Sequence, residues 1–98
     1  MVRPSKALSG REQEVRLLVL RFGYKNPIVY GSVARGEDTE TSDLDILVEP
    51  DRDDLSIFDR LELQGRIEAL LGVPVDVKTE KWIAERGMKK VREEGKPL

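Results

Sequence analysis

The chain of 98 residues contains no cysteine and no histidine. Disulfides, thiolate metal sites and imidazole ligands are therefore excluded, and carboxylates remain as the only strong metal ligands. Oxygen ligands favour Mg²⁺ or Mn²⁺ over zinc or copper. Any metal chemistry of this protein is thus expected to be that of a hard cation held by Asp or Glu.

Long hydrophobic runs and an excess of positive charge are also missing. No apolar run approaches the ~20 residues that a membrane span needs, and no signal-peptide pattern opens the chain, so we expect a cytoplasmic protein without a membrane partner. With 17 Lys and Arg against 19 Asp and Glu, the net charge is −2, which argues against direct nucleic-acid binding. The length predicts one globular domain over residues 1–98.

The apolar spacing predicts alternating helices and strands. A capping-box pattern, Ser9-Gly10-Arg11-Glu12, precedes a helical apolar stripe that ends at Gly23. The later predicted elements are a strand at 28–30 after an Asn26-Pro27 turn, a helical turn at 32–36, a strand at 43–48, a helix at 55–71, a strand at 73–77 and a helix at 79–94 interrupted at Gly87. This order predicts an α+β (mixed α/β) fold, a small mixed sheet flanked by helices that we expect on one side.

Asp43 and Asp45 are the strongest functional signal. Residues two apart in a strand point to the same face, so both carboxylates can bind one or two cations. Asp76 can join them if its strand lies beside the strand at 43–48. An isolated Asp-x-Asp in an amphipathic strand is common and usually carries no function. The functional interpretation therefore depends on its neighbours along the chain.

The upstream neighbour is a turn suited to binding phosphate. Gly31 lets the backbone approach an anion, Ser32 adds a hydroxyl donor, and Arg35 would face the same direction in a helical turn. Ser42, directly before Asp43, can cap or orient the acidic strand. Taken singly, these residues are more often a turn and a surface charge. Together with the acids they predict nucleotidyl transfer, in which positioning and charge neutralisation supply most of the catalysis.

The segments 31–36 and 42–48, read as GSVARG and SDLDILV, resemble the DNA polymerase β-like nucleotidyltransferase superfamily and, within it, the minimal nucleotidyltransferases. The resemblance extends to the VPVDV segment at 73–77. It implies the fold of that superfamily, Asp43, Asp45 and Asp76 as catalytic metal ligands for Mg²⁺, and ATP or another nucleoside triphosphate as substrate. It also implies that Gly31, Ser32 and Arg35 bind the triphosphate, and we add Ser42 to this nucleotide-binding set.

Minimal members commonly pair with a HEPN-domain toxin and transfer AMP from ATP to a tyrosine hydroxyl of that toxin. The resemblance therefore implies an antitoxin, a protein adenylyltransferase in a hetero-oligomer with its toxin. The short chain leaves no room for a separate acceptor domain, so we expect the acceptor in another molecule, through a homodimer or a toxin complex.

Two alternatives stay open. One is a binding module that neutralises the toxin by contact alone, and the other is a nucleotidyltransferase of a small-molecule acceptor. The sequence does not identify the nucleotide preference, the acceptor atom, the number of nucleotides transferred or the stoichiometry of a complex.

Overall fold

The structure, a computed structural model, describes residues 2–98. Its elements in chain order are α1 (Pro4–Leu8), α2 (Glu12–Arg21), β1 (Tyr24–Tyr30), α3 (Ser32–Arg35), β2 (Leu44–Pro50), α4 (Ile57–Leu71), β3 (Val75–Lys78), α5 (Glu85–Glu94) and β4 (Lys96–Pro97). The four strands form one sheet in the order β3-β2-β1-β4. Strand β2 pairs parallel with β3 and antiparallel with β1, and β4 pairs antiparallel with β1, which confirms the mixed sheet.

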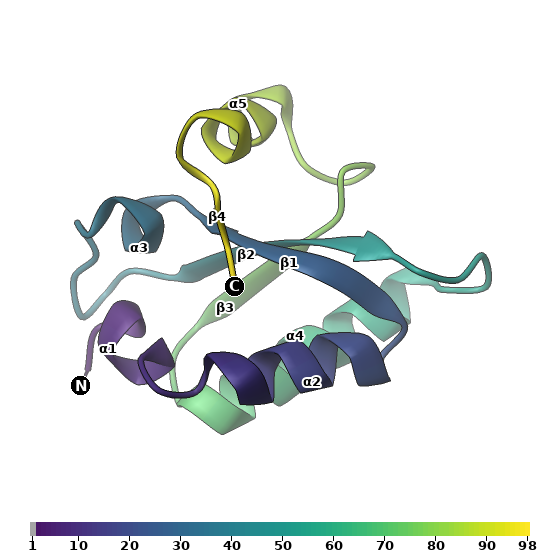
Figure 1. Cartoon of the computed structure of the whole chain (residues 1–98), viewed down its shortest axis with the longest axis horizontal. Helices are drawn as coiled ribbons and strands as arrows, with labels where there is room; N and C mark the ends of the chain where they lie inside the picture. Colours follow the sequence, from purple (N-terminus) through teal and green to yellow (C-terminus); the bar gives the residue numbers. More distant parts are fainter. Residues whose placement is uncertain (1) are drawn as a thin grey trace.

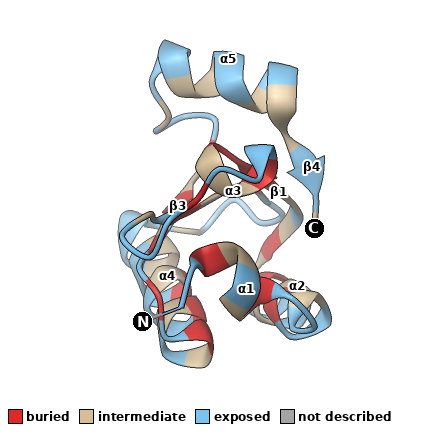
Figure 2. Ribbon diagram, turned by 90° about the vertical axis from the view of Figure 1, so that its left-hand side faces the viewer, coloured by how far each residue is buried: buried red, intermediate tan, exposed pale blue. Residues whose placement is uncertain are grey.

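The helices lie on both faces of the sheet. Figure 1 shows α2 and α4 side by side beneath the strands, with α1 next to them and α5 on the opposite side, and Figure 2 shows the same separation from the side. The expectation that the helices lie on one side is therefore wrong for α5, because the chain leaves β3 toward the open face of the sheet (Figure 1). No helix within residues 2–98 is both long and apolar enough to cross a membrane.

The buried core lies between the sheet and the pair α2 and α4. Alternation along β2 directs Leu44, Ile46 and Val48 into this core, where each is at most 2% exposed. The helices meet them with buried apolar residues at helical spacing: Val15, Val19, Leu63, Ile67 and Leu71. Residue 45 therefore belongs to the other face of β2, the one that α5 overlooks.

Two helix starts differ in how they are capped. The predicted capping box at Ser9 is wrong, because Ser9 is the C-cap of α1 and α2 begins at Glu12 without a side-chain cap. A capping box does open α4, where the Ser56 amide donates to Asp59 Oδ2 at 2.7 Å and the Phe58 amide donates to Ser56 Oγ at 3.2 Å.

Strand β1 and helix α5 both run through predicted breaks. The expected turn at Asn26-Pro27 is a bulge inside β1, with Asn26 at a φ of +51° and the register shifting between Lys25 and Ile28. The predicted interruption at Gly87 is absent, since Gly87 lies inside α5, and residues 79–84 are not helical. A Cβ on Gly87 would lie 2.7 Å from Ile83, so this glycine allows close packing rather than ending the helix.

Side chains of α4 cover the outer edge of β3. The amides of Val75 and Val77 donate to Glu68 Oε2 at 3.0 Å and to Gln64 Oε1 at 2.9 Å, and Arg60 Nη1 donates to the Val77 carbonyl at 2.6 Å. These helix residues are spaced four apart, so they line one face of α4. The contacts fix β3 against β2 and protect an edge that would otherwise be open to pairing.

Candidate active site

The site begins with a row of three polar side chains across neighbouring strands. In the sheet register Tyr30 lies opposite Asp45 on one side, and Asp76 lies opposite Asp45 on the other. All three belong to the face away from the core, since their neighbours along the strands fill the core. Asp76 can therefore join Asp45, as expected if their strands were neighbours, because its strand lies directly beside the strand of Asp45. Asp43, directly before β2, is exposed.

Negative charge at this row is only partly compensated. Burial and the charges of Asp76 and Asp43 raise the pKa of Asp45 to about 6, against a smaller lowering by Lys90 and Lys78. Lys78 Nζ lies 3.2 Å from Asp76 Oδ2. Burial, and then the charges of Asp45 and Asp76, also raise the pKa of Tyr30. The row therefore presents a half-buried carboxylate pair to any cation that reaches it.

The turn after β1 has to be glycine at its first residue. Gly31 has φ +79° and ψ −154°, a region that L side chains rarely adopt. A Cβ at this position would also lie 2.6 Å from Asp45 Oδ2. Gly31 thus brings the backbone of the turn directly against Asp45. We call Asp45 and its neighbours Asp76 and Tyr30 the carboxylate row.

Two of the predicted phosphate ligands converge on one anionic oxygen. The Gly31 amide and Arg35 Nη1 both donate to Glu94 Oε1, at 3.2 and 2.8 Å. Arg35 Nε also donates to Glu37 Oε1, at 2.7 Å. The turn therefore forms an anion site beside the carboxylates, and in this structure a carboxylate of α5 fills it. Sequence reasoning did not identify Glu94, because nothing in its local pattern marks it.

The two serines have different positions. Ser32 is the first residue of α3 and is half-buried next to Gly31. Ser42 Oγ accepts a hydrogen bond from the Thr39 amide at 2.9 Å, which closes the turn that leads into Asp43. This position agrees with an orienting role for Ser42, and its place in the nucleotide-binding set stays a prediction.

The residues fit a hard cation by their chemistry, although they are not gathered into a finished metal site. Within residues 2–98 no group of three or more acidic side chains is arranged to hold a metal ion. Asp45 and Asp76 nevertheless lie side by side with oxygen donors only, and burial, followed by the charges of Asp76 and Asp43, raises the pKa of Asp45. A cation there would compete with Lys78 for Asp76.

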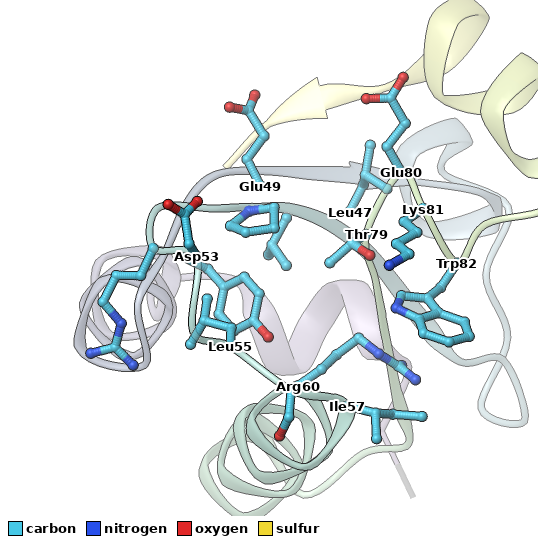
Figure 3. Close-up of a pocket in the computed structure, with 15 residues that line it drawn as sticks. Leu47, Glu49, Asp53, Leu55, Ile57, Arg60, Thr79, Glu80, Lys81 and Trp82 are labelled. Carbon is cyan, nitrogen blue, oxygen red and sulfur yellow. The ribbon is translucent and has the colours of Figure 1, made fainter.

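A hollow of about 810 Å³ lies at the other end of the sheet, where β1 begins and β2 and β3 end. Figure 3 shows Trp82 and Lys81 on one side of it and Asp53 and Leu55 on the other, with Arg60 of α4 between them. None of the predicted site residues lines this hollow, so it is separate from the carboxylate row.

A carboxylate pair beside an anion site is the arrangement of an enzyme that transfers phosphoryl or nucleotidyl groups. The comparisons with known proteins give the particular class. The family described as nucleotidyltransferase domain matches residues 15–98. A Methanocaldococcus jannaschii protein provisionally named protein adenylyltransferase MJ1379 is 41% identical over 81% of this chain and 80% of its own. The protein adenylyltransferase MntA of Thermococcus cleftensis is 42% identical over 71% of this chain and 67% of its own.

Solved structures agree with this assignment. One provisionally described as a minimal nucleotidyltransferase has a TM-score of 0.82 and 39% identity, covering 96% of this chain and 95% of that one. A toxin–antitoxin structure that contains MntA has a TM-score of 0.74 and 26% identity, covering 89% of this chain and 70% of that one. The chain belongs to the nucleotidyltransferase domain family and is a minimal nucleotidyltransferase.

Proposed function

We propose that this nucleotidyltransferase transfers AMP from ATP to a tyrosine hydroxyl of a HEPN-domain toxin and thereby acts as its antitoxin. Similar proteins support this proposal, since the M. jannaschii and T. cleftensis relatives carry the name protein adenylyltransferase. The MntA of a structural neighbour occurs in a toxin–antitoxin pair.

One observation carries the proposal. The register pairs Asp45 with Asp76, and Gly31 and Arg35 place two converging anion donors beside that pair. Nucleotidyl transfer needs donors that hold the triphosphate and carboxylates that act at the attacked phosphorus. The turn that carries Gly31 and Arg35 lies against Asp45, the neighbour of Asp76.

The roles of the residues follow from their positions. Gly31, Ser32 and Arg35 hold the phosphates, and Ser42 orders the loop that carries Asp43. Asp43, Asp45 and Asp76 would hold Mg²⁺, as one or two ions, and Mn²⁺ would be the expected substitute. When bound, the cation neutralises the charge that develops on the phosphates.

The proposed reaction is an in-line displacement. The tyrosine oxygen forms a bond to the α-phosphorus, the bond from that phosphorus to the α,β-bridging oxygen breaks, and diphosphate leaves. The proton of the hydroxyl passes to a carboxylate of the row. The products are AMP-tyrosine and diphosphate.

A protection assay with site variants tests the proposal against neutralisation by contact alone. Toxin activity is measured with the wild type, with Asp43→Asn/Asp45→Asn, and with Asp51→Asn/Asp53→Asn as the control, which removes the same charge from an exposed loop. Loss of protection in the first variant only, with the toxin complex still formed, supports catalysis. Unchanged protection by the first variant would contradict it and favour contact.

A further inference from the structure

The C-terminal residue of α5 occupies the anion site described above. Glu94 Oε1 accepts hydrogen bonds from the Gly31 amide and from Arg35 Nη1, and its side chain is 21% exposed. A carboxylate oxygen and a phosphate oxygen make the same kind of charge-assisted contact with such donors. A phosphate bound at Gly31 and Arg35 would therefore need the place that the Glu94 oxygen takes.

Helix α5 also presents a positive charge toward the acidic side of the site. Lys90 lies four residues before Glu94, so the two side chains share one face of the helix. The charge of Lys90 acts on Asp45, as does that of Lys78, which contacts Asp76 at 3.2 Å. One face of α5 therefore places the Glu94 carboxylate at the anion donors and the Lys90 ammonium group near the carboxylates.

Helix α5 packs on β1 but lies outside the buried core. No residue of α5 is buried, and Figure 2 shows the helix standing clear of the layer formed by α2 and α4. Its pairs Lys89–Glu93 and Arg92–Glu85 lie within the helix. Beyond Glu94, the chain is held by the short pairing of β4 with Ile28 and Val29. A rotation of the Glu94 side chain away from Arg35 would therefore leave the core packing in place.

We propose that Glu94 is an internal competitor of the nucleotide, whose carboxylate holds the phosphate donors until a phosphate displaces it. This inference rests on the proposed function, because it takes Gly31 and Arg35 as phosphate ligands. Its consequence is that Glu94 lowers the affinity for the nucleotide. A residue that merely positioned Arg35 for the phosphate would raise that affinity instead.

The test is the dissociation constant of a non-hydrolysable ATP analogue with MgCl₂, measured by calorimetry without toxin. Glu94→Gln keeps the size of the side chain and removes its charge, and we expect about a five- to tenfold lower Kd, the effect of one partly exposed charge-assisted contact. Glu93→Gln, at the exposed neighbour, makes the same change of net charge and should leave the Kd within about twofold of the wild type. An unchanged or higher Kd for Glu94→Gln would overturn the inference.

A double-mutant cycle makes the result specific. In the Arg35→Ala background, the fold decrease in Kd caused by Glu94→Gln should be less than half of that in the wild-type background. The reason is that one of the two groups for which the carboxylate competes is absent. An undiminished gain would contradict competition at Arg35. Thermal unfolding of each variant confirms that it folds, and Glu94→Gln should melt slightly below the wild type while binding more tightly.

A second probe separates this inference from the proposed function. Inorganic tripolyphosphate should bind Glu94→Gln more tightly than the wild type and shift the NMR resonance of the Gly31 amide. If both probes bind as expected and no partner is modified, the proposed function fails and the competitor role stands. If neither probe binds the wild type or Glu94→Gln, both fail.

Discussion

At the scale of single residues, Gly31 allows the backbone of the turn to lie against the carboxylate of Asp45. Its φ of +79° and the 2.6 Å separation between a would-be Cβ and Asp45 Oδ2 constrain it twice. Gly36 also has a positive φ, +72°, but its ψ of 23° lies in the left-handed helical region, and a Cβ there would have nothing within 4 Å. Gly31 is therefore constrained both by its backbone conformation and by Asp45, whereas Gly36 is constrained by a milder backbone conformation alone.

We therefore predict that Gly31→Ala is far more damaging than Gly36→Ala. The first should lower the free energy of unfolding by about 3 kcal/mol and abolish nucleotide binding, and the second by about 1 kcal/mol with binding retained. Urea unfolding and calorimetric titration of the ATP analogue measure the two effects. Equal losses in both variants would contradict the special constraint at Gly31.

Asp38 gives a prediction about pH. It is 5% exposed, and its Oδ2 accepts the Ser5 amide at 2.8 Å, which joins the loop before Asp43 to α1. Burial alone would raise the pKa of Asp38, but the hydrogen bonds from Ser5 outweigh it and the pKa lies below its ordinary value of 3.8. A lowered folded pKa stabilises the protein above the unfolded pKa and loses that effect as the pH falls through the folded one.

Asp38→Ala should accordingly cost about 1–2 kcal/mol of unfolding free energy at pH 7, and the difference from wild type should shrink as the pH falls below about 4. Asp53→Ala, at an exposed position, serves as the control and should show little change at any pH. Urea unfolding at pH 7, 5 and 3 measures both. If the difference in unfolding free energy between Asp38→Ala and the wild type grew as the pH fell, this role of Asp38 would be contradicted.

At the scale of elements, the placement of Asp76 depends on α4. The edge of β3 is closed by side chains of α4, among them Gln64, whose Oε1 accepts the Val77 amide. Gln64→Leu keeps most of the volume but removes this acceptor, and we predict a loss of about 1–2 kcal/mol in the free energy of unfolding. Glu62→Leu, at an exposed position of the same helix, should change it by less than about 0.5 kcal/mol. Equal effects of the two substitutions in urea unfolding would show that the edge contact is not specific.

Local patterns predicted the elements well where the core dictates them. The alternation at 43–48 and the stripe of α4 follow directly from burial, and β2 and α4 lie where they were expected. The bulge at Asn26-Pro27 did not follow, because it depends on the pairing of β1 with β2. The helical Gly87 did not follow either, because it depends on a close contact with Ile83 that the pattern does not show. The two-residue strand β4 is too short to leave any periodic signal.

The site was predictable only where local periodicity determines the direction of a side chain. The period of two puts Asp45 on the open face of β2, but only the sheet order could bring Asp76 beside it. Glu94 lies 63 residues from Gly31 in sequence and has no motif, so only the folded chain shows that it fills the anion site. The ion pair between Lys78 and Asp76 likewise becomes visible only in the folded chain.

At the scale of the whole molecule, the layers leave the carboxylate row on the face of the sheet that α5 overlooks (Figures 1 and 2). The hollow of about 810 Å³ lies where β2 and β3 end, and none of the predicted site residues lines it. The two tyrosines of the chain are only 2% and 5% exposed. We therefore expect the acceptor hydroxyl to come from a partner protein.

The most direct test is the intact mass of a partner toxin, taken from the adjacent reading frame, after incubation with this chain, MgCl₂ and each of the four nucleoside triphosphates. The account predicts a gain of one or more AMP units with ATP. This gain should be abolished by EDTA, restored by Mn²⁺ and absent with Asp43→Asn/Asp45→Asn. A stable complex whose toxin gains no mass with any of the four nucleotides would contradict the account.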